Sequence, residues 1–168
     1  FSEGVAKVKK NGKYGLINED GKGLTSYKYD WADSHRKGGT RVGVNEKYGL
    51  VNDQGKEIIP LKYDWIGKPS EGLTKVRLDN KTGFVDLNNK LVIDFKFDYA
   101  DDFKNGLARV KIDKKWGFIN REGRLIIQPE YQKLRNFYDE RALVVKDKKV
   151  GYINRIGEEI IKPQFRYG

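Results

Sequence analysis

Residues 103–123 read Phe-Lys-Asn-Gly-Leu-Ala-Arg-Val-Lys-Ile-Asp-Lys-Lys-Trp-Gly-Phe-Ile-Asn-Arg-Glu-Gly, and related stretches recur along the whole chain. A lysine, a variable and mostly bulky residue and a glycine return together every 34 residues, without insertion or deletion. The glycines of this column are Gly15, Gly49, Gly83, Gly117 and Gly151. A fixed period of about 20–50 residues is the sequence signature of a repeat architecture. The 168 residues are therefore predicted to form one array of five units, 1–34, 35–68, 69–102, 103–136 and 137–168.

Each unit is predicted to consist of antiparallel strands joined by tight turns. In the first unit, residues 5–10, 13–18 and 22–31 are rich in β-branched and aromatic side chains, which favours strands. Asn11-Gly12 is typical of a two-residue type I′ hairpin turn. Residues 18–21 fit a type I turn that ends with glycine in the left-handed region. The other units carry different residues at the first turn, where a longer loop stays open as an alternative. No helical period occurs.

The hairpin register predicts a middle strand that is apolar on both faces. With a two-residue first turn, Val8 lies opposite Gly15, and Leu16 and Ile17 point to opposite faces. A strand of this kind must be covered on both sides, so consecutive units are expected to pack face to face. Tyr14 and its equivalents are then expected in the core. The recurring glycine is expected to mark a close approach that belongs to this stacking.

The third strand of each unit shows the clearest alternation. Residues 27–31 read Tyr-Lys-Tyr-Asp-Trp, and residues 61–65 and 95–99 repeat the pattern. Such alternation predicts one apolar and one charged face. Prolines occur near the start of this strand in three units, at Pro60, Pro129 and Pro163. Because proline cannot donate to a strand ladder, they indicate an edge or a break.

These columns resemble the WG-repeat family of bacterial proteins, also described as KWG repeats. The fourth unit matches the family unit best, over residues 103–110 and 115–123 and at Ile126, Ile127 and Tyr131. The signature tryptophan of the column occurs only at Trp116. The resemblance covers the whole chain and implies an all-β fold of tandem antiparallel β-meander repeats with a variable number of units. It implies no general biochemical activity.

A variable number of units favours five units stacked in an open curved array. The alternative is a closed five-bladed ring similar to a propeller, because five units of three or four strands are enough to close one.

Composition excludes several classes of protein. The chain has no cysteine, which excludes disulfide scaffolds, thiolate metal sites and cysteine nucleophiles. It has 34 basic and 24 acidic side chains, giving a formal net charge of +10. No apolar run approaches the roughly 20 residues that a membrane-spanning helix needs. The chain opens on Phe1 without an initiator methionine, so a fragment or a processed product is expected.

The sequence contains no constellation typical of a catalytic, cofactor or metal site. The single histidine, His35, lies at a position where three other units have phenylalanine. It is expected to be a substitution at a semi-exposed turn, with contact to a ligand as the alternative. Carboxylates recur with the repeat at Asp30, Asp64 and Asp98. Because catalytic groups normally occur once, these acids are expected on solvated strand faces and as turn caps, and not in a glycosidase or cation site.

Basic and aromatic residues recur together along the predicted array. If the third strand lies at a sheet edge, its exposed candidates for binding are Trp31, Trp65, Tyr99, Lys28, Lys62 and Lys96. The leading hypothesis is a non-enzymatic repeat scaffold that binds another protein, expected at a bacterial cell surface or in the periplasm. The alternative is a module that binds an anionic polymer, either an acidic glycan or a nucleic acid, through the periodic lysines and aromatic rings. An enzyme ranks third, and no cofactor is expected.

Overall fold

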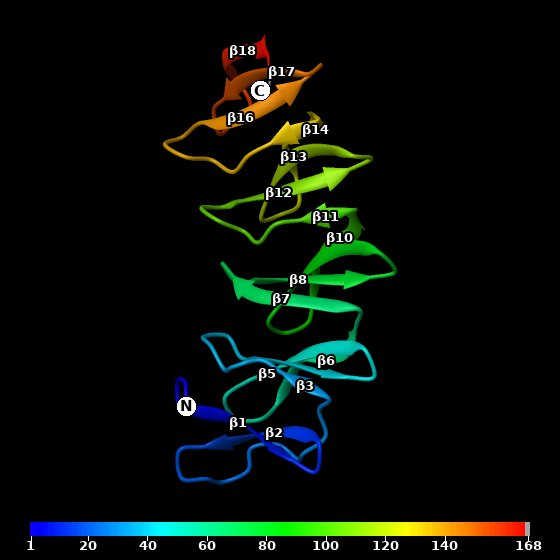
Figure 1. Ribbon diagram of the computed structural model, residues 1–168, viewed down its shortest axis with the longest axis vertical. Helices are drawn as coiled ribbons and strands as arrows, with labels where there is room; N and C mark the ends of the chain where they lie inside the picture. Colours follow the sequence, from blue (N-terminus) through cyan, green and yellow to red (C-terminus); the bar gives the residue numbers. More distant parts are fainter. Residues whose placement is uncertain (167–168) are drawn as a thin grey trace. The chain divides into compact units, whose positions relative to one another are not determined.

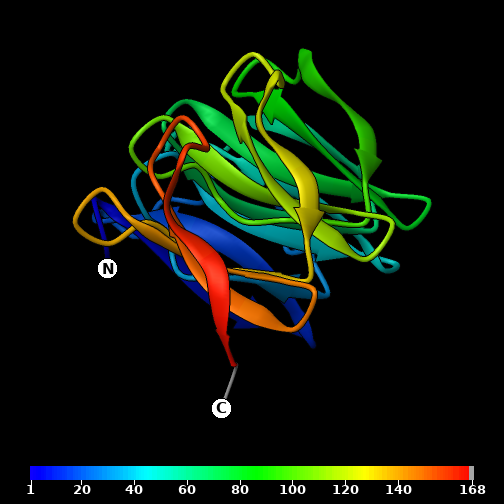
Figure 2. The ribbon, with the colours of Figure 1, turned by 90° about the horizontal axis from the view of Figure 1, so that it is seen from above.

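The computed structural model describes residues 1–166, and within that range it contains strands, turns and loops but no helix (Figure 1). The predicted all-β fold is therefore confirmed. Residues 167 and 168, the end of the fifth predicted unit, lie outside the described part of the chain. The strands of each sheet are antiparallel and twisted (Figure 2).

The strands form one two-stranded and four four-stranded sheets, none of which closes on itself within residues 1–166. The two-stranded sheet contains β1 (Val5–Lys10) and β2 (Lys13–Asn18). The next sheet contains β3 (Trp31–Ala32), β4 (Thr40–Val44), β5 (Lys47–Val51) and β6 (Glu57–Tyr63). It is followed by β7 (Trp65–Ser70), β8 (Leu73–Leu78), β9 (Lys81–Asp86) and β10 (Leu91–Phe97). The fourth sheet contains β11 (Tyr99–Ala100), β12 (Leu107–Ile112), β13 (Lys115–Asn120) and β14 (Leu125–Tyr131). The last contains β15 (Lys133–Leu134), β16 (Ala142–Lys146), β17 (Lys149–Ile153) and β18 (Glu159–Arg166).

The chain divides into two compact units. The first comprises residues 1–79 and 84–91, and the second comprises residues 80–83 and 92–166, so the boundaries fall in the turn before β9, within β9 and within β10. Each four-stranded sheet begins with a short or edge strand from the end of one predicted 34-residue unit and takes its other strands from the next.

The first hairpin turn has two residues in every repeat. Asn11 and Gly12 have φ values of 50° and 81°, which confirms the predicted type I′ turn. The other four repeats adopt the same backbone with residues other than glycine, for example Asn45 at 48° and Glu46 at 59°. The longer loop considered for these repeats is therefore wrong. In the first repeat, Val8 pairs with Gly15, which confirms the predicted register.

The third predicted strand does not run through as one element. Its chain leaves one sheet and enters the next at the aspartate column, as at Asp64 between β6 and β7. Side chains on either side of this crossing therefore face different environments: Tyr63 is buried, whereas Trp65 is 41% exposed. The expectation of a single apolar face across residues 61–65 is wrong, because the alternation spans two sheets.

Each middle strand is buried on both faces. In β5, the consecutive residues Gly49, Leu50 and Val51 are all buried, as the apolar pattern predicted. The cover comes from neighbouring repeats. In the first compact unit, the core combines first-repeat residues with second-repeat residues in one cluster, whose members are Val5, Leu16, Tyr29, Ala32, Val42 and Val51. In the second unit, an equivalent cluster joins residues of the fourth and fifth repeats, Phe118, Ile127, Tyr131, Leu134, Ala142, Val144 and Ile153. Consecutive repeats thus share a core, as predicted.

The glycine column has a local role, not the expected role in stacking. A Cβ atom at Gly49 would lie 2.5 Å from the carbonyl oxygen of Ile59 on the next strand of the same sheet. The register of β5 and β6 shifts at this point, and Pro60 lies beside it on the edge strand β6. The glycine therefore leaves room for a β-bulge within its own repeat.

We expect Gly49→Ala to lower the free energy of unfolding by roughly 3 kcal/mol, since backbone atoms of β6 would have to move. Gly15→Ala is the matched control, because the nearest atom there is a tyrosine ring carbon, Cδ1 of Tyr27, at 3.1 Å. That ring can shift, and the expected loss is below roughly 1 kcal/mol. Urea denaturation followed by circular dichroism measures both variants. Equal losses at the two positions would contradict the bulge as the reason for the glycine.

Candidate functional site

Exposed aromatic side chains lie on the edge strands of three sheets. β3, β7 and β11 are each the terminal strand of their sheet. Their first residues, Trp31, Trp65 and Tyr99, are 40%, 41% and 46% exposed. Trp31 and Trp65 belong to the first compact unit and Tyr99 belongs to the second. The condition set for the predicted binding residues, a position at a sheet edge, is met for these three aromatic residues. Their binding role stays a prediction.

Two of these aromatic rings, Trp31 and Tyr99, contact a ring two strands away in the same sheet. Trp31 contacts Tyr48 edge to face at 5.9 Å between ring centroids, and the Arg41 guanidinium lies 5.5 Å from the Trp31 centroid. In the second compact unit, Tyr99 contacts Trp116 at 5.7 Å. Such pairs restrict the rings, so that little side-chain entropy remains to be lost on binding.

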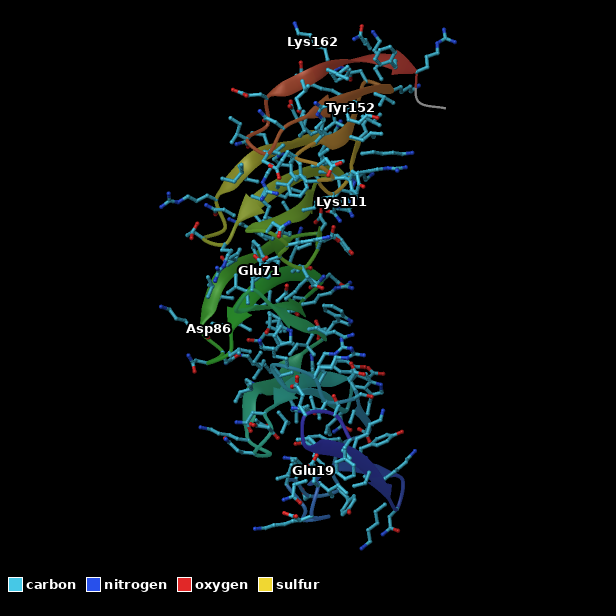
Figure 3. All side chains as sticks on the ribbon, turned by 90° about the vertical axis from the view of Figure 1, so that its left-hand side faces the viewer. Glu19, Glu71, Asp86, Lys111, Tyr152 and Lys162 are labelled. Atoms are coloured by element: carbon cyan, nitrogen blue, oxygen red, sulfur yellow. The ribbon has the colours of Figure 1, made fainter. Side chains whose placement is uncertain are left out.

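Cations lie over the exposed tryptophan Trp65 and over Trp116, the ring that contacts Tyr99. The Lys75 ammonium lies 5.2 Å from the centroid of Trp65. Over Trp116, the Arg109 guanidinium lies at 4.4 Å and the Lys111 ammonium at 5.3 Å (Lys111 is labelled in Figure 3). These distances fit cation–π contacts. Each cluster therefore presents an aromatic surface beside positive charge.

The half-buried column of Tyr14, Tyr48 and Trp116 forms the inner border of this surface. Tyr14 and its equivalents were expected in the core, and these three are half-buried. Tyr14 packs against the core cluster of the first compact unit and Trp116 against that of the second, whereas Tyr48 and Trp116 contact the edge-strand rings of Trp31 and Tyr99.

The predicted lysines lie over a different set of rings. Lys28, Lys62 and Lys96 extend over the rings of the residues that follow them, Tyr29, Tyr63 and Phe97, at 5.2, 5.1 and 5.4 Å. Lys28 also donates to Glu57 at 2.7 Å, and this hydrogen bond raises the pKa of its ammonium group. The structure thus brings Arg41 and Lys75, and not Lys28 and Lys62, to the exposed tryptophans.

Arg41 and Arg109 also link consecutive sheets. Arg41 bonds Asp33 with 2.5 Å between Nη2 and Oδ2 and donates from Nη1 to the Ile66 carbonyl on β7 at 3.2 Å. In the second unit, Arg109 makes the same two links, to Asp101 and to the Leu134 carbonyl at 2.6 Å. We call this arrangement the arginine strap. The strap holds the guanidinium group of Arg41 beside the ring of Trp31 and against the edge strand β7 of the next sheet.

The recurring aspartates are structural links between repeats. Asp64 accepts a hydrogen bond from the Lys47 ammonium of its own repeat at 2.5 Å and from the backbone N–H of Asp79 in the next turn at 2.9 Å. Asp98 makes equivalent bonds to Lys81 and to the Asp113 N–H. We call these residues, with Asp30, the clamp aspartates. Their bonding to the lysine and to the turn N–H lowers the pKa of each carboxyl group.

His35 is buried, at 5% exposure, and its Nδ1 lies 2.8 Å from the Thr40 hydroxyl. The expected position at a semi-exposed turn is therefore wrong. The imidazole occupies the place of the buried Phe103 of the fourth repeat, and Thr40 satisfies its polar atom.

The described residues contain no cluster of three or more acidic or histidine side chains placed to hold a metal ion. In the same range, no helix is long and apolar enough to cross a bilayer.

The sequence showed Lys7 and its equivalents recurring beside aromatic rings, but these cations were not among the binding candidates predicted from it. Lys7, Arg41, Lys75 and Arg109 recur at the same 34-residue period as the glycine column. In the same column, Leu143 interrupts the series. The column alone does not reveal which ring each cation contacts, because that depends on side-chain packing across strands.

The family described as "WG containing repeat" matches the chain in six segments, at residues 1–14, 14–48, 48–81, 83–116, 116–149 and 151–167. No curated protein matches.

Two solved structures are similar to the chain. One is KlHsv2 with loop 6CD replaced by a Gly-Ser linker, with a TM-score of 0.54 and 15% identity over 100% of this chain. The other is Hsv2 from Kluyvelomyces marxianus, with a TM-score of 0.53 and 13% identity over 99% of this chain. The chain spans 65% of the length of each. At this level of identity the similarity concerns the fold alone.

The clamp aspartates predict a pH dependence of stability. A carboxyl group whose pKa is lower in the folded than in the unfolded chain stabilises the fold above the unfolded value of about 3.9, and this contribution is lost as pH falls through the folded pKa. We expect Asp64→Asn to lower the Tm by a few degrees at pH 7 and to flatten the decrease of Tm below about pH 4. Thermal melts from pH 7 to pH 2 measure both effects. Asp53→Asn, at an exposed turn carboxylate, is the control. Parallel melting curves for wild type and Asp64→Asn across this range would contradict the clamp.

Proposed function

Because the chain belongs to the WG-repeat family, we propose that it is a non-enzymatic repeat scaffold whose edge-strand aromatic residues bind another protein. The observation that carries the proposal is the recurrence of exposed Trp31 and Trp65 on the edge strands of successive sheets, each with a cation over or beside its ring.

The composition of these clusters supports a protein partner. Tryptophan, tyrosine and arginine are enriched among the residues that dominate binding energy in protein interfaces. Trp31, Tyr48 and Arg41 combine all three in one cluster, and Tyr99, Trp116 and Arg109 do so in the second unit. Their mutual contacts organise the side chains before a partner arrives, which reduces the entropic cost of association.

Repetition of the cluster supports a multivalent mode of binding. Several weak contacts on one chain raise the overall affinity, because the second contact forms at a high effective concentration once the first has formed. A repeat scaffold obtains this effect by presenting one side chain type at equivalent places in successive repeats.

Photo-crosslinking in extracts of the source organism tests the proposal. We expect p-benzoylphenylalanine at positions 31 and 65 to capture the same protein, and the Trp31→Ala/Trp65→Ala variant to lose its retention of that protein at least tenfold. Leu91→Ala is the matched control, since Leu91 is 46% exposed in the same compact unit but lies outside the aromatic column. Turnover of a substrate by the purified chain, with no crosslinked partner, would overturn the proposal.

The second candidate function is binding to an anionic polymer. It is favoured by Lys62 and Lys96, whose ammonium groups form no ion pair within residues 1–166 and lie beside aromatic rings. Phosphate or sulfate groups attract such ammonium groups, and exposed rings offer stacking surfaces.

Heparin chromatography separates the two functions. Binding to an anionic polymer predicts retention that falls steeply with salt, with Lys62→Gln/Lys96→Gln eluting at clearly lower salt than wild type. Lys148→Gln, at an exposed turn, is the control for loss of one charge. Weak retention that does not change with salt would exclude this second function.

A further inference from the structure

The fifth repeat has lost the side chains that join the other repeats to their successors. The position of the strap cations Arg41 and Arg109 holds Leu143, and the position of their acid partners Asp33 and Asp101 holds Arg135. The position of the clamp aspartates holds Arg166. Leucine cannot donate to a carbonyl group, and the two arginines reverse the charge of the acids that they replace. The outer face of the sheet β15–β18 is therefore chemically unlike the faces that pack against another repeat.

A pocket lies on this altered face. Its volume is about 570 Å³, and its lining includes Arg135, Arg141, Tyr138, Leu143 and Tyr152 (Tyr152 is labelled on β17 in Figure 3). At the equivalent place in the second repeat, a pocket of about 140 Å³ is lined in part by Lys68 and Pro69 on β7 of the following sheet. In the part of the chain described, no segment supplies such a wall for the pocket of the fifth repeat.

Two arginines of this pocket, Arg135 and Arg141, are exposed in the described part of the chain. Within residues 1–166, the guanidinium groups of Arg135 and Arg141 make no ion pair and no side-chain hydrogen bond. Glu140, the acid next to Arg141, forms an ion pair with Arg155, with 3.6 Å between Oε2 of Glu140 and Nε of Arg155. The pocket lining contains one carboxylate, Asp139, against two guanidinium groups. Its charge is therefore positive.

Backbone hydrogen bonds hold the segment that carries these groups. Arg141 and Tyr138 exchange backbone hydrogen bonds of 2.9 and 3.0 Å across a two-residue turn. The Arg135 N–H donates to the Leu143 carbonyl at 2.9 Å, which holds the edge strand β15 against β16. Leu143 pairs with Tyr152 in the neighbouring strand, so an apolar and a phenolic side chain lie between the arginines on the same face.

We propose that this face binds an acidic segment of a partner protein, with carboxylate side chains at Arg135 and Arg141 and an apolar side chain against Leu143 and Tyr152. The assignment deepens the proposed scaffold function and rests on it for the class of partner, while using a different surface from the edge-strand aromatic residues. Planar guanidinium groups bind carboxylates in a bidentate manner, and tyrosine hydroxyls donate to the same oxygens. Charge complementarity selects the segment, because two guanidinium groups face one carboxylate here and Arg135 stands where Asp33 and Asp101 lie in other repeats.

Fluorescence anisotropy with a labelled hexapeptide of alternating glutamate and leucine tests the proposal on the whole 168-residue chain. We expect binding that weakens at least about fivefold in Arg135→Gln/Arg141→Gln, the loss of two charged contacts at an exposed site. The same peptide with glutamine in place of glutamate should bind wild type no more tightly than the acidic peptide binds Arg135→Gln/Arg141→Gln. Arg121→Gln, an exposed arginine at a turn of the same compact unit, should bind as wild type. Melting curves establish that all variants are folded.

Several outcomes would overturn the proposal. The first is equal affinity of wild type and Arg135→Gln/Arg141→Gln for the acidic peptide. The second is equal affinity of wild type for the two peptides. The third is binding of inorganic phosphate to the protein without displacement of the bound acidic peptide. A concentration-dependent dimer in sedimentation, abolished by the same double substitution, would instead identify a second copy of the chain as the occupant. Trp31→Ala/Trp65→Ala should bind the acidic peptide as wild type does. Failure of the peptide with intact crosslinking at positions 31 and 65 would therefore remove only this inference.

Discussion

The fold depends on the burial of a middle strand that is apolar on both faces. In β5, three consecutive residues are buried, so both faces of the strand are covered. A single repeat of 34 residues has too few side chains to cover both faces of its own sheet. The neighbouring repeat supplies the cover, as Leu16 and Tyr29 do for Val42 and Val51 in the first compact unit. Full burial of one aliphatic side chain contributes about 1.5–3 kcal/mol relative to exposure. A repeat therefore gains its core from its neighbour, and stability accumulates along the chain.

Polar links follow from the same requirement, because packing face to face must also fix the rotation of one repeat on the next. The clamp aspartates join a lysine of one repeat to a turn N–H of the next, and the arginine strap reaches the next edge strand. Several charged side chains of this basic chain are thus paired with one another at the surface. The two-residue turns keep a backbone with positive φ even at Glu46 and Lys114, and the clamp bonds at Asn45 and Asp113 hold those turns in place.

Function is argued from two kinds of position in this fold. Recurring exposed residues, such as Trp31 and Trp65, present equivalent contacts at successive sheet edges. Residues that break the repeat, such as Arg135 and Leu143, mark a face whose chemistry differs from that of a repeat interface. His35 shows that a break in the pattern is not sufficient evidence of a site, since it fills the place of a buried phenylalanine and bonds Thr40.

The sequence by itself determined the period, the all-β class, the turn at Asn11-Gly12 and the pairing of Val8 with Gly15. These features depend on local φ preferences and on the two-residue period of a strand, which a repeated sequence displays several times over. Only the tertiary structure decided that Tyr63 is buried and Trp65 exposed, because the chain changes sheets at Asp64 between them. It also decided that Arg41 lies beside Trp31 and bonds the carbonyl of Ile66, 25 residues away, a contact that exists only when one sheet packs on the next.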